Sequence, residues 1–304
     1  MGLTTITLKS PFIKTYHKTS YPAISPLRPE LSQVGKTVLI AGGSTGIGYA
    51  IAQGFVQAKA SRVIILGRRQ DVVEASAAKL AAESADKKTS VVGLQCDIVD
   101  LSDSQKLWAG FKEDDIFIDV LVMNAAVVGG VSKLMEGGVE KTWRAFEVNV
   151  RTLLDFAWRF EQQEGDRLKH LINISTSGIH NFNTDSKPIP LYGLTKNAGT
   201  LAMQQYARQV DPSKLRIISI QPGGVLTEMA RSNGMDESVY DWDHETLPGH
   251  FSVWATSGEA KFLHGRFVPV HWDVDELKGS AMRQAIDEDY HFLTVGVIGV
   301  IGDK

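Results

Sequence analysis

The stretch Thr37-Val-Leu-Ile-Ala-Gly-Gly-Ser-Thr-Gly-Ile-Gly48 joins a short apolar run to a helical pattern through a turn rich in glycine. Residues 37–41 have the length and composition of a buried strand, and Ile47, Ile51 and Phe55 recur at helical spacing. The glycine spacing G-x-x-x-G-x-G allows a tight turn and brings the amides of a helix N-terminus close to a pyrophosphate. A plain turn between strand and helix is the alternative. We predict that the turn binds the phosphates of a dinucleotide through Gly42, Ser44, Thr45, Gly46, Ile47 and Gly48.

The same rhythm continues outward from this turn, because apolar runs alternate with segments of helical pattern. The apolar runs are residues 37–41, 62–66, 91–95, 116–123, 171–174 and 216–220, with a seventh candidate at 266–271. Further helical patterns are residues 71–85, 102–112, 139–160 and 191–209. This alternation predicts an α/β fold, a doubly wound parallel sheet of the Rossmann type with about seven strands. Pro269 predicts an edge position for the last strand, since proline lacks a backbone N–H.

With 304 residues, the chain has the length of one α/β domain with additional segments. We expect an N-terminal arm at residues 1–33 and a single domain at 34–304, which ends in a C-terminal extension at 273–304. Residues 228–260 interrupt the rhythm before the last strand, and this favours a substrate lid over a surface insertion. Within this segment, the candidates for an aromatic substrate wall or for ordinary lid packing are Trp242, Phe251 and Trp254.

Composition and charge argue against several classes of partner. The formal net charge of −3 does not favour nucleic acid or an anionic membrane, and no apolar run is long enough to span a bilayer. Cys96 is the single cysteine, so a reducing, cytoplasmic location fits. No histidine pair has the spacing of a metal site, and we expect no catalytic metal. The first 29 residues lack acids, as a transit peptide does, but their four prolines favour an extended arm that packs on the domain.

The end of the second apolar run indicates which dinucleotide binds. An acid at this point would bond the ribose diol and favour NAD, but the chain has Gly67-Arg68-Arg69. Because a guanidinium pairs bidentately with a 2′-phosphate, Arg68 and Arg69 favour NADP. The alternative is that both arginines are solvated surface charges.

Tyr192 is followed four residues later by Lys196, so the two side chains share one face of a helix. A nearby ammonium favours the phenolate, and we therefore expect the pKa of Tyr192 to fall from about 10 toward neutral pH. The pair predicts a general acid for a carbonyl oxygen, or a general base for an alcohol. An ordinary pair on a helix surface is the alternative.

Several short motifs occur in a characteristic order along the chain. They are the glycine turn, Asn124-Ala-Ala126, Asn149 within Phe-Glu-Val-Asn-Val, Tyr192-Gly-Leu-Thr-Lys196 and Gln221-Pro-Gly223. Together, over residues 34–272, they resemble the short-chain dehydrogenase/reductase family. The arm at 21–32 and the tail at 262–302 are also similar to a fungal branch of that family, and this similarity further weakens the transit-peptide interpretation.

The resemblance implies a role for each matching residue. Tyr192 would be the catalytic acid, Lys196 would tune it and hold the nicotinamide ribose, and Asn149 would bind a water that links Lys196 to solvent. Asp97 would bond the adenine amino group, with Ile98 beside it at the cofactor. Asn124 and Ala125 would pass near the adenosine ribose. The residues expected around the nicotinamide are Pro222, Gly223, Val225 and Thr227, the last near the carboxamide.

The chain departs from the family pattern in a few places. Ala126 stands where the family has glycine. At the position of the catalytic serine, matching from the strand aligns Thr176, whose methyl group narrows the site, and Ser175 and Ser177 are the alternatives. Tyr192 follows Thr176 by 16 residues, a longer spacing than the commonest one in the family. We therefore expect an extra loop at residues 180–190 to border the substrate.

The resemblance implies an NADP(H)-dependent oxidoreductase. It would transfer a hydride between nicotinamide and a carbonyl or alcohol of a small or medium hydrophobic molecule, such as a secondary metabolite. A redox-neutral enzyme, such as an isomerase or cyclase, and an NADP-binding sensor are the alternatives on the same fold. The resemblance also implies a homodimer or homotetramer formed through the helices at 139–160 and 191–209. The expected partner is a small-molecule substrate, with no nucleic acid and no membrane.

Overall fold

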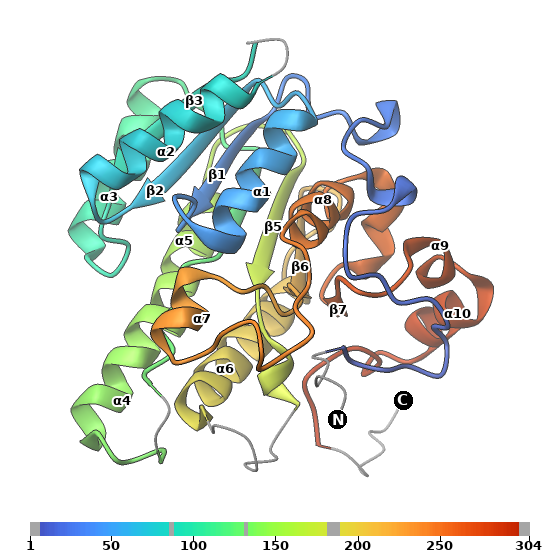
Figure 1. Cartoon of the computed structure of the whole chain (residues 1–304). Coiled ribbons are helices and arrows are strands. Elements are labelled where there is room, and N and C mark those ends of the chain that lie inside the picture. Colours follow the sequence, from blue (N-terminus) through green and yellow to red (C-terminus); the bar gives the residue numbers. More distant parts are fainter. Residues whose placement is uncertain (1–6, 85–87, 131–132, 181–188, 298–304) are drawn as a thin grey trace.

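The computed structural model describes residues 7–84, 88–130, 133–180 and 189–297, which contain a parallel sheet of seven strands (Figure 1). The order across the sheet is β3-β2-β1-β4-β5-β6-β7, so the winding direction reverses between β1 and β4. The strands are β1 (Thr37–Ala41), β2 (Arg62–Gly67), β3 (Ser90–Gln95), β4 (Val120–Met123), β5 (Lys169–Ile174), β6 (Leu215–Gln221) and β7 (Phe267–Pro269). The predicted doubly wound α/β fold is confirmed, and Pro269 lies in an edge strand as expected.

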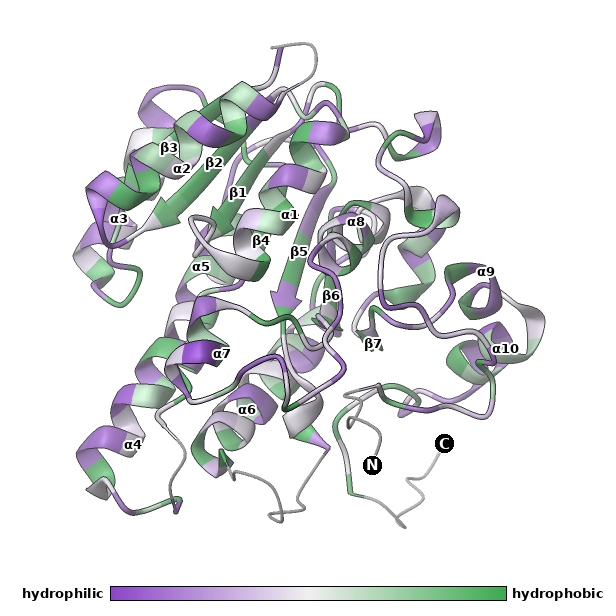
Figure 2. Cartoon of the chain, viewed as in Figure 1, coloured by the Kyte–Doolittle hydropathy of each residue, from purple (hydrophilic) through white to green (hydrophobic). Residues whose placement is uncertain are grey.

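Burial and local hydrogen bonds decide where the strands begin. Every residue of β4 and β5 is buried, and Figure 2 shows β1 and β2 as predominantly hydrophobic. The apolar run predicted at 116–123 forms a strand only from Val120. The reason is that the main-chain N–H and C=O of Ile118 both bond to the side-chain amide of Gln163 instead of to a neighbouring strand.

Helices cover both faces of the sheet, as the alternating pattern predicts. On one face, a single hydrophobic cluster joins the strands to α1 (Gly46–Gln57), α2 (Gln70–Glu83) and α8 (Thr246–Ala255). On the other face, a second cluster joins them to α3 (Leu101–Glu113), α5 (Thr152–Glu161) and α6 (Pro190–Ala207).

The helix predicted at 139–160 is divided in the structure. It consists of α4 (Gly138–Phe146), a π-helical turn η3 (Glu147–Arg151) and then α5. The shorter helices are α7 (Glu228–Ser232), α9 (Val274–Leu277) and α10 (Ser280–Glu288), and the 3-10 turns are η1 (Pro22–Ile24), η2 (Pro29–Leu31), η4 (Ser177–Ile179) and η5 (Gly258–Leu263). No helix in the described part of the chain is long and apolar enough to cross a bilayer.

Helix α8 belongs to the core, which corrects the predicted extent of the lid at residues 228–260. A Cβ atom at Gly54 of α1 would lie only 2.7 Å from a carbonyl oxygen of α8, so glycine allows these two helix backbones to touch. Phe251 and Trp254 have no exposed surface and do not form an aromatic substrate wall. Of the segment predicted as a lid, only residues 228–245, which include α7, lie beside the carboxyl ends of β5 and β6 (Figure 1).

The N-terminal arm is packed on the domain over its described residues, 7–33. Ile13, Ile24 and Leu31 are buried in the same cluster as α1 and α8. Tyr16 forms an antiparallel bridge with Trp272, three residues after the end of β7. The Tyr21 hydroxyl donates to the carbonyl of Trp272 and accepts from the N–H of Val274, at 3.2 and 2.9 Å. The arm therefore joins the C-terminal extension rather than extending away from it.

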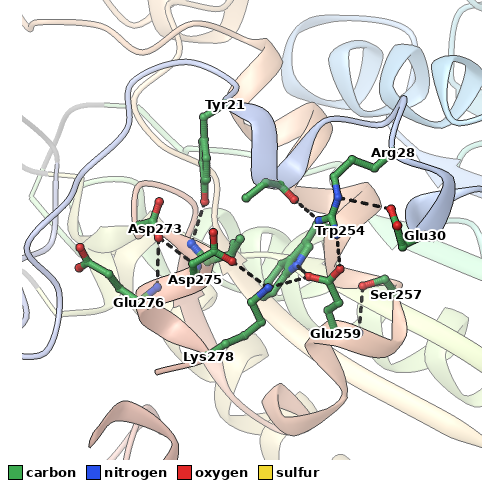
Figure 3. Close-up of polar contacts among 12 residues, drawn as sticks. Tyr21, Arg28, Glu30, Trp254, Ser257, Glu259, Asp273, Asp275, Glu276 and Lys278 are labelled. Carbon is green, nitrogen blue, oxygen red and sulfur yellow. Dashed lines mark hydrogen bonds and ion pairs between the residues drawn. The ribbon is translucent and has the colours of Figure 1, made fainter. Parts of the chain in front are cut away.

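A second contact of the arm is centred on Glu259 of η5 (Figure 3). Its carboxylate accepts from Arg28 of the arm at 2.6 Å, from Lys278 at 2.8 Å and from the indole of Trp254 at 3.2 Å. Burial alone would raise the pKa of Glu259, but these three hydrogen bonds outweigh it and lower the pKa to about 2. The arm, η5 and the C-terminal extension are thus joined by one charged cluster.

Candidate functional site

The glycine turn at residues 42–48 follows β1 and leads directly into α1. Gly42 has a φ of +77° and Gly46 a φ of +54°, which glycine adopts without strain. A Cβ atom at Gly48 would lie 2.1 Å from the carbonyl oxygen of Gly42, so only glycine fits there. At the start of α1, Thr45 occupies the N-cap position but makes no capping bond through its side chain. The amides of the first turn can therefore face a phosphate, as the sequence predicts.

The residues after β4 support this turn from the adjacent strand. The Asn124 side-chain amide donates to the carbonyl of Gly42 at 2.8 Å. The N–H of Ala125 donates to the carbonyl of Ala41 at 2.9 Å, and a Cβ at Gly42 would lie 2.9 Å from the Ala125 methyl carbon. Asn124 and Ala125 therefore shape the glycine turn, and their expected position near the ribose stays a prediction.

The carboxyl end of β2 lies beside the turn. A Cβ at Gly67 would lie 3.3 Å from the Ser44 hydroxyl oxygen, and the side chains of Arg68 and Arg69 are exposed. The Ser44 carbonyl accepts from Ser76 of α2 at 2.9 Å. Two exposed arginines thus follow β2 next to the glycine turn, and their expected contact with a ribose 2′-phosphate stays a prediction.

Asp97 and Ile98 follow the carboxyl end of β3. Ile98 is buried, and the Asp97 carboxylate accepts from the N–H of Val99 at 3.1 Å. The N–H of Asp97 donates to the Asp103 carboxylate at 3.3 Å. These local bonds fix the segment at the edge of the site, and the expected contact of Asp97 with adenine stays a prediction.

The segment after β6 returns to the glycine turn. A Cβ at Gly46 would lie 2.9 Å from the Thr227 methyl carbon, so the two segments are in contact. The N–H of Thr227 donates to the carbonyl of Val225 at 2.9 Å, and its hydroxyl caps α7 by accepting from the N–H of Ala230. Residues 222–227 therefore border the same space as the start of α1.

Tyr192 and Lys196 lie on one face of α6, near the carboxyl end of β5. The Lys196 ammonium donates to the carbonyl of Ile174 at 2.6 Å and lies 5.9 Å from the centroid of the Tyr192 ring. Burial lowers the pKa of Lys196 to about 8. Burial also raises the pKa of Tyr192 to about 12, so the predicted fall in that pKa is wrong for the chain alone. The ammonium bonds to the strand, and desolvation of the phenolate dominates.

Asn149 lies in the π-helical turn between α4 and α5, and such turns are frequent at functional sites. Its side-chain oxygen accepts from the N–H of Val127 at 2.9 Å, and its amide donates to the Val127 carbonyl and to the Thr195 hydroxyl, each at 2.9 Å. The buried side chain thereby connects the segment after β4 to α6, next to Lys196. The expected water between Asn149 and Lys196 stays a prediction.

The hydroxyl groups after β5 differ in their access to the site. Ser175 is buried and bonds to the Thr200 hydroxyl at 2.6 Å, so it is not available to a substrate. Thr176 is half-buried, and its hydroxyl caps η4 by accepting from the N–H of Gly178 at 3.2 Å. A Cβ at Gly193 would lie 3.0 Å from the Gly178 carbonyl oxygen, which shows how closely this turn approaches the residue after Tyr192. Of the three candidates, Thr176 and Ser177 remain, and Ser175 is corrected to a structural role.

Two further expectations concern loops and metals. Most of the extra loop expected beside the substrate, residues 181–188, lies outside the described residues. Among the residues that the structure does describe, no group of three or more histidine, cysteine, aspartate or glutamate side chains could hold a metal ion.

A sequence model of short chain dehydrogenases matches residues 36–238, which include the glycine turn, Asn149 and Tyr192 with Lys196. The chain belongs to the short-chain dehydrogenase/reductase family. Fungal members are similar along nearly the whole chain. A short chain dehydrogenase/reductase of Claviceps purpurea is 33% identical over 288 residues, 94% of each chain. The short chain dehydrogenase/reductase AacuD of Aspergillus aculeatus is 31% identical over 285 residues, 94% of this chain and 96% of its own.

Solved short-chain dehydrogenase/reductase structures share the fold at lower identity. The Pseudomonas aeruginosa RhlG/NADP active-site complex superposes with a TM-score of 0.70 at 20% identity, over 80% of this chain and 97% of that one. A 3-oxoacyl-[acyl-carrier protein] reductase with bound NAD from Brucella melitensis gives a TM-score of 0.68 at 23% identity, over 84% and 97%. Both support the same arrangement of sheet and helices.

Asp243 and His271 also lie at the site, although no sequence pattern predicted them there. The Asp243 carboxylate accepts from the N–H of Gly224 at 2.6 Å and from the imidazole of His271 at 2.7 Å. The two are 28 positions apart and form no known motif, so only the folded chain brings them together beneath the segment after β6.

Proposed function

We propose that this short-chain dehydrogenase/reductase transfers a hydride between NADP(H) and a carbonyl or alcohol of a small or medium hydrophobic molecule. The observation that carries the proposal is the position of Tyr192 and Lys196 on α6, against the turn that holds Thr176 and beside the carboxyl ends of the central strands. This is where ligands of open parallel sheets bind. Met229 of α7, two residues after Thr227, is exposed, and an apolar side chain there supports a hydrophobic substrate.

In this proposal the chain binds, orients and protonates the substrate. Bound NADPH supplies the hydride. The Tyr192 hydroxyl donates a proton to the carbonyl oxygen, and a high pKa in the chain alone keeps this proton in place until a substrate is bound. The Thr176 hydroxyl donates a hydrogen bond to the same oxygen. Lys196, whose pKa of about 8 lies near working pH, can pass a proton toward Tyr192.

Arg68 and Arg69 support NADP as the cofactor, because they follow β2 at the point where an acid would favour NAD. Similar folds bind either dinucleotide: RhlG was solved with NADP, and the Brucella melitensis reductase with NAD. The preference of this chain therefore depends on its own residues at that point.

Replacing both arginines by alanine tests this preference. Each lost charge-assisted hydrogen bond to a 2′-phosphate is worth about 1.5–3 kcal/mol, and this corresponds to about a tenfold to hundredfold loss of affinity. We therefore expect the double variant to bind NADPH at least about tenfold more weakly. NADH binding should change little, and fluorescence titration measures both. Arg62→Ala, at the amino end of the same strand, is the matched control. NADPH affinity equal to that of the unchanged chain would rule out the assignment of these arginines.

We also propose a homodimer or homotetramer formed through α4, α5 and α6. Large apolar side chains are exposed on these helices, including Trp143 at 63% and Trp158 at 54%. Exposed apolar surface of this kind marks interaction sites. Light scattering of the purified chain should give at least twice the monomer mass of 33.3 kDa, and a monomer at micromolar concentration would contradict the proposal.

A cytoplasmic location, proposed from the single cysteine, can be tested by cell fractionation.

A further inference from the structure

A buried, hydrogen-bonded pair of side chains, Asp243 and His271, lies against the loop at residues 222–225. Oδ2 of Asp243 accepts from the N–H of Gly224 at 2.6 Å and from Nε2 of His271 at 2.7 Å. The N–H of Asp243 returns a hydrogen bond to the Gly224 carbonyl at 2.7 Å. Asp243 is 8% exposed and His271 is not exposed at all. A carboxylate bonded in this way is withdrawn from water and has an imidazole as its side-chain donor.

The conformation of the loop is matched to this carboxylate. Gly223 has a φ of +86°, and a Cβ atom there would lie 2.8 Å from Oδ2 of Asp243. The loop backbone therefore rests against the carboxylate with no room for a side chain. His271 follows the edge strand β7, which pairs with β6 just before the loop. The pair thus ties the loop to the end of a neighbouring strand.

The N-terminal arm covers the same pair. The N–H of His17 donates to the His271 carbonyl at 2.8 Å, and the N–H of His244 donates to the Lys18 carbonyl at 2.8 Å. The Lys18 ammonium lies 2.6 Å from the Asp241 carboxylate and 3.9 Å from that of Asp243. Two adjacent arm residues therefore contact the segments on both sides of the pair and add a positive charge near the carboxylate.

We propose that Asp243 and His271, supported by Lys18 of the arm, are positioning residues that hold loop 222–225 in the form that receives the nicotinamide half of the cofactor. This inference rests on the proposed function. Removing one partner leaves a buried polar group unpaired, and the loop amides then shift to find other partners. Among the described residues, no hydrogen bond or ion pair joins Asp243 or His271 to the glycine turn or to the arginines after β2, so the adenosine half of the site should be unaffected.

Two ligands test the two halves of the site independently. NADPH occupies both halves, whereas 2′-phospho-ADP-ribose lacks the nicotinamide and occupies only the adenosine half. For Asp243→Ala and His271→Leu, we expect NADPH to bind at least about tenfold more weakly, as loss of one buried hydrogen bond to a charged group implies. Binding of 2′-phospho-ADP-ribose should stay within about twofold of the unchanged chain. Asp243→Asn and His271→Gln keep an acceptor and a donor, respectively, and should restore most of the NADPH affinity.

Two variants of the arm test the inference without removing a buried side chain, in case the Asp243 and His271 variants fail to fold. Lys18→Met removes the ammonium near the pair, and Lys14→Met makes the same change at an exposed position four residues earlier. Only Lys18→Met should weaken NADPH binding, by about two- to fivefold, since this ion pair is partly exposed. Equal affinities for NADPH in the two variants, or parallel losses of both ligands, would overturn the inference. If the unchanged chain binds neither NADPH nor NADH, the proposed function itself fails, which is a distinct result.

Discussion

Tyr192→Phe should lower kcat by about 10²–10⁴-fold, the contribution of a well-placed general acid. The phenyl ring keeps the place of the tyrosine ring on α6, with the ammonium of Lys196 near it, but it has no proton to give to a carbonyl oxygen. NADPH affinity should therefore stay the same. Measuring steady-state turnover together with NADPH titration separates the loss of chemistry from any loss of binding.

Tyr206→Phe is the matched control for this prediction. Tyr206 lies near the opposite end of the same helix, and its hydroxyl bonds to the Glu161 carboxylate. The same chemical change there should leave kcat unaltered. Full turnover by Tyr192→Phe, or an equal loss in both variants, would remove Tyr192 from the mechanism.

Trp254→Ala should destabilise the fold by about 3–5 kcal/mol, a large part of the total of about 5–15 kcal/mol that holds a domain together. Trp254 of α8 is fully buried in the core, and its indole N–H donates to Glu259 at 3.2 Å. The substitution leaves a cavity and removes one donor of the charged cluster in Figure 3. Urea unfolding followed by circular dichroism gives the free energy of unfolding.

Trp242→Ala provides the comparison at a position in residues 228–245, the part of the predicted lid that precedes α8. Trp242 is half-buried in the segment before α8, and its indole donates to the carbonyl of Asp236 at 2.8 Å. Its removal should cost much less stability, about 1 kcal/mol, because part of its surface is already in water. If Trp254→Ala is as stable as Trp242→Ala but changes KM for the substrate, then α8 belongs to the lid after all.

The fold was largely predictable from the sequence, because its signal is local. Each strand between residues 37 and 95 is a short apolar run next to a helical pattern, and the structure places them within a residue or two. Two errors have tertiary causes. Residues 116–118 are as apolar as a strand, but the main chain of Ile118 bonds to the side chain of Gln163, just after α5, and the N–H of Ile116 donates to the carbonyl of Phe111. Helix α8 contains Pro248 and Gly249 and has polar residues between its apolar ones, so no periodic stripe indicated that it lies in the core.

The sequence indicates which residues gather at the candidate site, but it carries less information about their electrostatics. The spacing of Tyr192 and Lys196 correctly predicts a shared helix face, but a sequence pattern carries no information about burial. Desolvation raises the pKa of the tyrosine where an ammonium alone would lower it. For the same reason the pattern could not distinguish Ser175, which bonds to Thr200, from Thr176. The Asp243–His271 pair depends entirely on the fold.

The transfer of deuterium from NADPH to substrate tests the proposed reaction most directly. The chain is incubated with NADPH deuterated at either face of nicotinamide C4 and with a panel of hydrophobic ketones and aldehydes, and products are analysed by mass spectrometry. We predict that one of the two labelled cofactors delivers its deuterium to the carbinol carbon, and that Tyr192→Phe abolishes the transfer. Tight binding of NADPH, with a substrate converted but no deuterium leaving the cofactor, would contradict hydride transfer and identify a redox-neutral enzyme.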